Sequence, residues 1–130
     1  MKSYIWDTGG LTLYFADESE SKGLMKECLE NNVGKIPHII LLELYYLQWR
    51  EFGKRIAKHR VEGLLESKME IITLHDEILF IAGEYKVKFP KLSIVDSMLV
   101  AFGKKSGSTI ITTELHLTQL KGIKSIKLEW

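Results

Sequence analysis

Four carboxylic acids stand where a metal-assisted reaction could be built. Asp7 follows the apolar run SYIW, and Glu114 comes just after the β-branched run STIIT. Glu43 stands among leucines in LLELYYL, and Asp96 lies in SIVDSM. Carboxylates held together repel one another unless a cation lies between them, and oxygen ligands of this kind suit Mg²⁺ or Mn²⁺. Such an ion can polarise a phosphodiester and lower the pKa of a bound water, so the four acids indicate metal-dependent nuclease chemistry.

Each acid also has a simpler explanation. Asp96 fits a helix-capping box, in which an acid only satisfies a backbone donor. Asp7 precedes two glycines and fits an Asx-turn. Glu114 could be a favourable charge at a helix N-terminus, worth about 0.3–1 kcal/mol. Glu43 is harder to explain in this way, because a carboxylate in an apolar helix needs a partner or a metal.

Apolar and β-branched runs alternate with helical patterns along the chain. The runs predict short strands at 3–6, 35–40, 69–74, 108–112 and 125–130. The helical patterns lie at 17–31, at 41–67 with a break at Gly53, at 76–88, at 93–105 and briefly from Glu114. Gly9 and Gly10 indicate a tight turn after the first strand. Together these elements favour a parallel, doubly wound α/β sheet in a single domain, residues 1–130.

The predicted sheet gives the four acids a common location. In sheets of this kind, sites form outside the carboxyl ends of the strands, near a topological switch point. Asp7 follows the first predicted strand and Glu114 follows the fourth, while Glu43 and Asp96 lie in the first turns of predicted helices. We therefore expect the four carboxylates to meet at one edge of the sheet.

The order and spacing of these segments resemble the PIN domain family, and most of all its VapC-type toxins. YIWDTGGLTLYF resembles the family's first strand, where an apolar run ends in Asp followed by Ser or Thr. IILLELYYL resembles the segment with its early-helix Glu, and KLSIVDSMLVAFGKKSGSTIITTELHL resembles its third segment. The resemblance covers nearly the whole chain. It implies a three-layer α/β/α fold around a central, mostly parallel sheet of four to five strands.

The resemblance also implies an activity and partners. It implies a small endoribonuclease that uses Mg²⁺ or Mn²⁺, forms a homodimer, and is inhibited by a VapB-like antitoxin protein whose peptide occupies the active groove. Carried over by position, Asp7, Glu43, Asp96 and Glu114 are the catalytic acids, and Asp7, Asp96 and Glu114 are the metal ligands. RNA as the substrate, in place of DNA, rests on the resemblance alone.

The chain departs from the family pattern after its fourth predicted strand. Glu114 occupies a position where Asp is more common, and its extra methylene still allows it to reach a metal. A second acid two residues later is common in the family, and an aromatic follows it, but here these positions hold His116 and Leu117. Histidine in place of an acid removes a negative charge and favours a softer or weaker set of ions.

Hydroxyl and basic side chains near the acids are candidates for substrate binding. Thr8, Thr112 and Thr113 supply hydroxyls near strand ends, and the resemblance implies a Ser or Thr near the last acid. Arg50 and Lys54 recur at helical i, i+4 spacing and could follow a phosphate backbone. Local capping by the threonines and a solvated helix face are the alternatives for these residues.

Composition limits the classes of protein that the chain can represent. Its 130 residues carry a net charge of +1, so no bulk basic field attracts nucleic acid and any such site must be local. Cys28 is the only cysteine, which excludes an internal disulfide and a cysteine metal cluster. The sequence carries neither a signal-peptide pattern nor an apolar run of membrane-spanning length. We therefore expect a cytoplasmic protein that does not contact membranes.

Two other classes of protein remain as alternatives. One is a catalytically weak or inactive PIN-like module that binds RNA or protein, in which His116 marks a decayed metal site. The other is a phosphoacceptor receiver domain, which should carry an acidic pair after its first strand and a lysine after its last. Asp7-Thr8 gives no such pair, so the receiver domain is the less favoured of the two.

Overall fold

The computed structural model describes residues 2–130, in which five strands form one sheet in the order β3-β2-β1-β4-β5. All four pairings between neighbouring strands are parallel. The strands are β1 (Tyr4–Trp6), β2 (Gly34–Pro37), β3 (Glu70–Ile72), β4 (Thr109–Thr112) and β5 (Ser125–Lys127). The helices of residues 2–130 are α1 (Thr8–Phe15), α2 (Ser19–Asn31), α3 (His38–Phe52), α4 (Lys54–Leu65), α5 (Asp76–Lys88), α6 (Ile94–Ser106) and α7 (Leu115–Thr118). The predicted parallel α/β sheet is confirmed.

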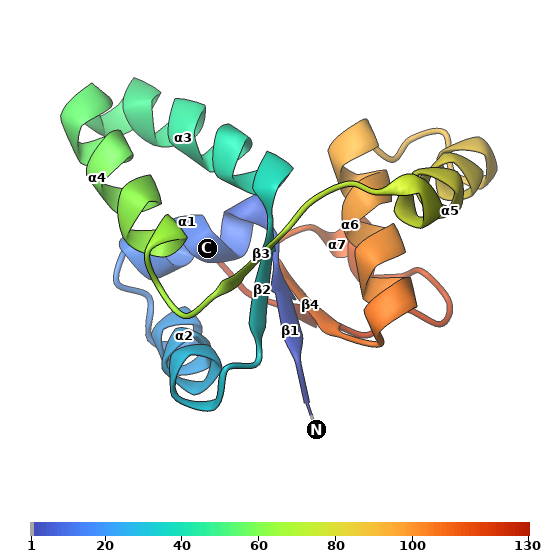
Figure 1. Ribbon diagram of the computed structural model, residues 1–130, viewed down its shortest axis with the longest axis horizontal. Helices are drawn as coiled ribbons and strands as arrows, with labels where there is room; N and C mark the ends of the chain where they lie inside the picture. Colours follow the sequence, from blue (N-terminus) through green and yellow to red (C-terminus); the bar gives the residue numbers. More distant parts are fainter. Residues whose placement is uncertain (1) are drawn as a thin grey trace.

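Helices cover both faces of the sheet and make three layers (Figure 1). Because successive side chains of a strand point to opposite faces, Tyr4 and Trp6 enter one core and Ile5 enters the other. The first core is completed by residues from α1 to α4, and the second by residues from α5, α6 and α7. No helix among residues 2–130 is long and apolar enough to cross a bilayer.

The strand order places a topological switch point between β1 and β4. The chain runs outward from β1 to β2 and β3, and then returns across β1 to form β4 and β5 on the other side. Neighbouring parallel strands whose connections leave in opposite directions open a crevice at their carboxyl ends. Asp7 follows β1 and Thr113 follows β4, so both lie at this crevice.

The predicted tight turn at Gly9 and Gly10 is wrong, because both glycines lie inside α1. A Cβ at Gly9 would stand 2.1 Å from the Thr113 hydroxyl oxygen. A Cβ at Gly10 would stand 3.0 Å from the Ile111 side chain. The pair therefore lets the first turn of α1 approach the end of β4 closely, and Asp7 caps the helix directly.

Several predicted boundaries shift while the elements persist. The strand predicted at 35–40 ends at Pro37, and α3 begins at His38 because the apolar residues that follow pack at helical spacing. The strands predicted at 69–74 and 125–130 shorten to β3 and β5. The predicted break at Gly53 is confirmed, since this glycine adopts φ 90° between α3 and α4. Ser93 caps α6 and Gly107 ends it in the left-handed region, close to the predicted bounds of 93–105.

Candidate active site

Asp7 is the most constrained acid of the candidate site. It ends β1 and caps α1, and only 4% of its surface is exposed. One carboxylate oxygen accepts a hydrogen bond from the Thr8 backbone N–H at 2.7 Å. The other accepts one from the Thr112 hydroxyl, also at 2.7 Å. Both oxygens are thus held in place by the ends of two neighbouring strands.

Thr112 joins the two strand ends. Its side chain is fully buried, and its hydroxyl donates to Asp7 while it accepts a hydrogen bond from the Glu114 backbone N–H at 2.9 Å. The backbone N–H of Asp7 also donates to the Ile111 carbonyl at 2.9 Å. Thr112 therefore fixes the position of Asp7 relative to the segment that carries Glu114.

Glu43 has the partner that its apolar surroundings require. It lies half-buried in α3, and one of its carboxylate oxygens accepts a hydrogen bond from the Thr8 hydroxyl. Thr8 is buried in the first turn of α1, next to Asp7. The hydrogen bond ties α3 to the end of β1 and holds Glu43 over the same strand end as Asp7.

Asp96, Glu114 and His116 form the opposite side of the site. The Ser93 hydroxyl accepts from the Asp96 backbone N–H at 3.0 Å, so Asp96 lies in the capped first turn of α6 as expected. The Asp96 Oδ2 atom lies 3.0 Å from the Nε2 atom of His116. The Glu114 Oε2 atom lies 3.7 Å from the Nδ1 atom of the same imidazole. His116 therefore stands between two of the predicted metal ligands.

The four predicted acids line one hollow of about 420 Å³, which we call the acid hollow. Thr8 and Thr113 line it as well, whereas Thr112 lies beneath its floor, bonded to Asp7. Arg50 and Lys54 do not line it: their cationic groups lie over the rings of Tyr46 and Trp49, at 5.0 Å and 5.4 Å from the ring centroids.

Burial and like charges act together on Asp7. Burial raises the pKa of the Asp7 carboxyl to about 6, although the hydrogen bonds from Thr112 and Thr8 lower it. The negative charges of Asp96 and Glu43 add to the increase. Because the charged form of Asp7 is disfavoured in this environment, a cation in the acid hollow would relieve the repulsion.

The donors of the acid hollow match a hard divalent cation in chemistry, since oxygen-rich carboxylate sets suit Mg²⁺ and Mn²⁺. Among residues 2–130, however, no three His, Cys, Asp or Glu side chains are gathered closely enough to hold one ion. Asp96 is bonded to His116 and Glu43 to Thr8. An ion bound to the Oδ2 atom of Asp96 would have to displace the His116 imidazole, while Asp7 stays held by Thr8 and Thr112.

The acid hollow contains residues that sequence reasoning did not select. Leu47, Gln48 and Glu51 of α3 line it. Glu43, Leu47 and Glu51 recur at i, i+4 spacing, which is the signal that could have placed them on one helix face. Trp130 lines the hollow from beyond β5, and no local motif marks it.

Solved structures with a similar fold include VapBC complexes and a VapC toxin. VapBC from Salmonella typhimurium, solved bound to DNA, superposes with a TM-score of 0.75 at 18% identity, over 98% of each chain. VapBC2 from Rickettsia felis, bound to a DNA fragment from the promoter, gives 0.79 at 16% identity, over 97% of this chain and 98% of that one. Mycobacterium tuberculosis VapC20, described as a toxin that cleaves the Sarcin-Ricin loop, gives 0.67 at 19% identity, over 83% of this chain and 87% of that one.

Because the identities are only 16–19%, these likenesses show a shared fold and nothing more. A comparison with curated protein sequences returns no match for this chain. The model of the PIN domain matches residues 4–122, which span every acid of the hollow and nearly the whole chain. The three-layer fold and the matched residues agree, and the chain belongs to the PIN domain family.

Proposed function

We propose that the protein is a metal-dependent endoribonuclease, the toxin of a toxin–antitoxin pair, which cleaves RNA phosphodiesters at the acid hollow. The observation that carries the proposal is Asp7, a buried carboxylate held by two hydrogen bonds and repelled by the charges of Asp96 and Glu43. Such an arrangement is costly to a folded protein and is typical of functional sites. Membership of the PIN domain family and the fold shared with VapC20, a toxin that cleaves the Sarcin-Ricin loop, support the choice of substrate.

The proposal assigns a role to each acid. Asp7, Asp96 and Glu114 would hold Mg²⁺ or Mn²⁺, which when bound polarises a phosphodiester and lowers the pKa of a water. Glu43 is held by the Thr8 hydroxyl at the edge of the hollow, where its carboxylate can orient the attacking water and accept its proton. Thr112 acts through Asp7 as a positioning residue, because its hydroxyl is buried and already bonded on both sides.

The substrate contacts divide between the hollow and its surroundings. Thr113 lines the hollow and is the predicted threonine best placed to meet a phosphate, since Thr8 is bonded to Glu43. Arg50 and Lys54 lie outside the hollow, on the exposed side of the α3–α4 junction. There they would contact the RNA backbone beyond the cleaved bond, a role that salt should weaken.

We also propose a VapB-like antitoxin, a homodimer and a cytoplasmic location. The structures of the Salmonella and Rickettsia proteins are toxin–antitoxin complexes with the same fold, which supports the antitoxin. Large apolar side chains on α3 are exposed, among them Leu42, Tyr46 and Trp49, and they suit packing against a second chain. The lone thiol, Cys28, is buried and suits a reducing compartment.

One observation favours a second function, a PIN-like module that binds RNA or protein without cutting it. The Nε2 atom of His116 already lies 3.0 Å from the Oδ2 atom of Asp96, an oxygen that a metal ion would need. If Asp96 kept this partner, the hollow would lack a complete ligand set. Metal binding therefore separates the two functions more sharply than RNA binding does.

The test compares cleavage and metal binding in matched variants. We expect the wild type to cut structured RNA with Mg²⁺ or Mn²⁺ and to lose this activity in EDTA. Asp96→Asn should reduce cleavage by on the order of 10³-fold, since several kcal/mol of transition-state stabilisation depend on the ion. The control is Asp76→Asn, an acid in the first turn of α5 that does not line the hollow.

Two results would contradict the enzyme. One is cleavage that survives EDTA, and the other is equal cleavage by the two variants. If calorimetry with Mn²⁺ shows no binding by the wild type and RNA still binds, the non-catalytic module is the correct function.

A further inference from the structure

We propose that Trp130 is a nucleobase-stacking residue, which receives an unpaired base of the RNA beside the acid hollow. This inference rests on the proposed function, because it names a contact made by the same substrate at the same site. Trp130 lines the hollow together with Asp7, Asp96 and Glu114. Its side chain is 77% exposed, so a planar ligand can reach the ring.

The fold fixes where Trp130 lies. Leu128 extends the alignment of β5 along β4, because its backbone N–H donates to the Thr112 carbonyl at 2.8 Å, and its side chain is fully buried. Parallel strands end at the same edge of a sheet, so the residues after β5 reach the edge at which β1 presents Asp7. In Figure 1 the C-terminal end of the chain lies on the α1 side of the sheet, and Thr8 and Thr12 of α1 line the hollow with Trp130.

The charges of the hollow favour a neutral contact with the substrate. Five carboxylates line it, Asp7, Glu43, Glu51, Asp96 and Glu114, and no Lys or Arg is among its lining residues within 2–130. An RNA backbone entering such a site without a cation is repelled. Stacking of a base on an aromatic ring carries no charge penalty, and it is a general way of holding single-stranded RNA.

Other exposed aromatic rings near the site are already engaged. Arg50 covers Tyr46 and Lys54 covers Trp49, with their cationic groups at 5.0 Å and 5.4 Å from the ring centroids. Within residues 2–130, no cation and no second ring stacks on Trp130. Trp130 is therefore the exposed ring at the hollow whose faces are free for a base.

The experiment measures RNA binding in EDTA, where no cleavage occurs, with a labelled oligoadenylate of about ten nucleotides. Trp130→Ala should weaken binding by roughly 5- to 150-fold, the loss expected for one base–aromatic stack, and Trp130→Phe should retain most of the affinity. The loss should be the same at about 0.05 M and about 0.3 M salt, because the contact is uncharged. In a Trp49→Phe background, RNA should quench the fluorescence of Trp130, since the other remaining tryptophan, Trp6, is fully buried.

The control is Phe80→Ala, an exposed aromatic residue of α5 that does not line the hollow. Equal affinities of Trp130→Ala and the wild type would overturn the inference, and so would an equal loss in the control. Quenching that follows protein concentration in the absence of RNA would also overturn it, because a second copy would then cover the ring. If Trp130→Ala weakens binding but the wild type never cleaves RNA, stacking stands and the proposed nuclease function fails.

Discussion

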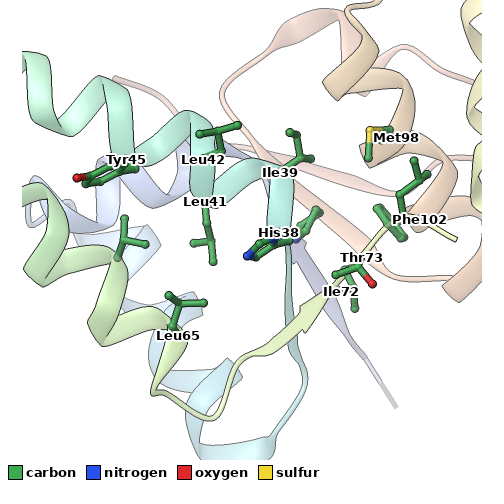
Figure 2. Close-up of a pocket in the computed structure, with 13 residues that line it drawn as sticks. His38, Ile39, Leu41, Leu42, Tyr45, Leu65, Ile72, Thr73, Met98 and Phe102 are labelled. Atoms are coloured by element: carbon green, nitrogen blue, oxygen red, sulfur yellow. The ribbon is translucent and has the colours of Figure 1, made fainter.

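Two hollows border α3, and they differ in chemistry. The acid hollow meets the helix at Glu43, Leu47, Gln48 and Glu51. On the other side lies a larger hollow of about 570 Å³, which we call the apolar groove, and its α3 residues are His38, Ile39, Leu41, Leu42 and Tyr45. Figure 2 shows the groove between α3, Leu65 of α4, and Met98 and Phe102 of α6. One helix thus separates a site suited to cations from a surface suited to apolar groups.

The separation follows from helical geometry. Residues three and four apart share a face, so 43, 47 and 51 form one stripe while 38, 41, 42 and 45 form another. Glu43 immediately follows Leu42 in the chain, yet the two side chains serve different hollows. Because the stripes are independent, substitutions on one side of α3 should leave the properties of the other side unchanged.

Among variants that keep all the predicted metal ligands, Thr112→Val should have the largest effect on the acid hollow. This change removes the hydroxyl that donates to Asp7 and accepts from the Glu114 backbone N–H. We expect the free energy of unfolding to fall by about 1–3 kcal/mol, because the buried Asp7 carboxylate and the Glu114 backbone N–H each lose a partner. We expect cleavage to fall by about 10- to 100-fold, as for other residues that orient metal ligands.

The matched control is Thr109→Val in the same strand. Thr109 is also buried, and its hydroxyl makes no hydrogen bond among the described residues. Urea unfolding and a cleavage assay check both variants. Equal behaviour of the two valine variants would mean that Thr112 does not position Asp7.

A second effect should appear in the pH dependence of stability. The pKa of Asp7 is about 6 in the folded chain against 3.8 for the unperturbed group, so the folded state binds this proton more tightly than the unfolded state. The stabilisation is therefore fully present below about pH 4 and is lost as the pH rises through about 6. The difference of roughly two pKa units corresponds to at most about 3 kcal/mol.

Asp7→Asn removes this titration and supplies the comparison. In EDTA, the variant should be more stable than the wild type above about pH 6, and the difference should vanish below about pH 4. Urea unfolding across this range measures it, and Leu42→Lys in the apolar groove should keep the wild-type pH profile. A difference between Asp7→Asn and the wild type that does not change with pH would contradict the link to the Asp7 carboxyl.

Sequence alone predicted the sheet well, for a physical reason. Strand runs such as STIIT are β-branched and buried on both faces because helices cover both sides of the sheet, and the parallel arrangement follows from the alternation of strands and helices. The prediction of a turn at Gly9 and Gly10 was wrong because a pair of glycines favours a turn when only the local sequence is considered. Their actual role is close packing against Thr113 and Ile111, residues more than a hundred positions away, which no local pattern reveals.

The sequence predicted which acidic residues gather at the site, but it did not predict which side chains they contact. Acids after strands are visible in the sequence, and the fold places all four in one hollow. The bond between His116 and Asp96 depends on the positions of side chains from two helices. The sequence showed only that His116 stands at a position where the family commonly has an acid. Trp130 reaches the hollow because β5 runs parallel to β4. This placement depends on how the strands pair in the sheet, and the residues next to Trp130 in the chain do not reveal it.

The smallest effect on folding, and the sharpest test of the two faces, is a pair of lysine substitutions on α3. Leu42 is 59% exposed on the groove side and Leu47 is 38% exposed on the hollow side. Each change should alter the free energy of unfolding by no more than about 0.5 kcal/mol, because both residues lie at the surface of α3. Each change should affect a different property, either the association of two copies or the binding of Mn²⁺.

Leu42→Lys should weaken the proposed association of two copies at least about tenfold, since a lysine buried in an apolar interface loses its hydration, and it should leave Mn²⁺ affinity unchanged. Leu47→Lys should leave association unchanged and weaken Mn²⁺ binding, because its ammonium group neutralises part of the negative charge that attracts the ion. Sedimentation and calorimetry with Mn²⁺ report the two properties separately. If each variant changed both properties, α3 would couple the two hollows and their separation would be wrong.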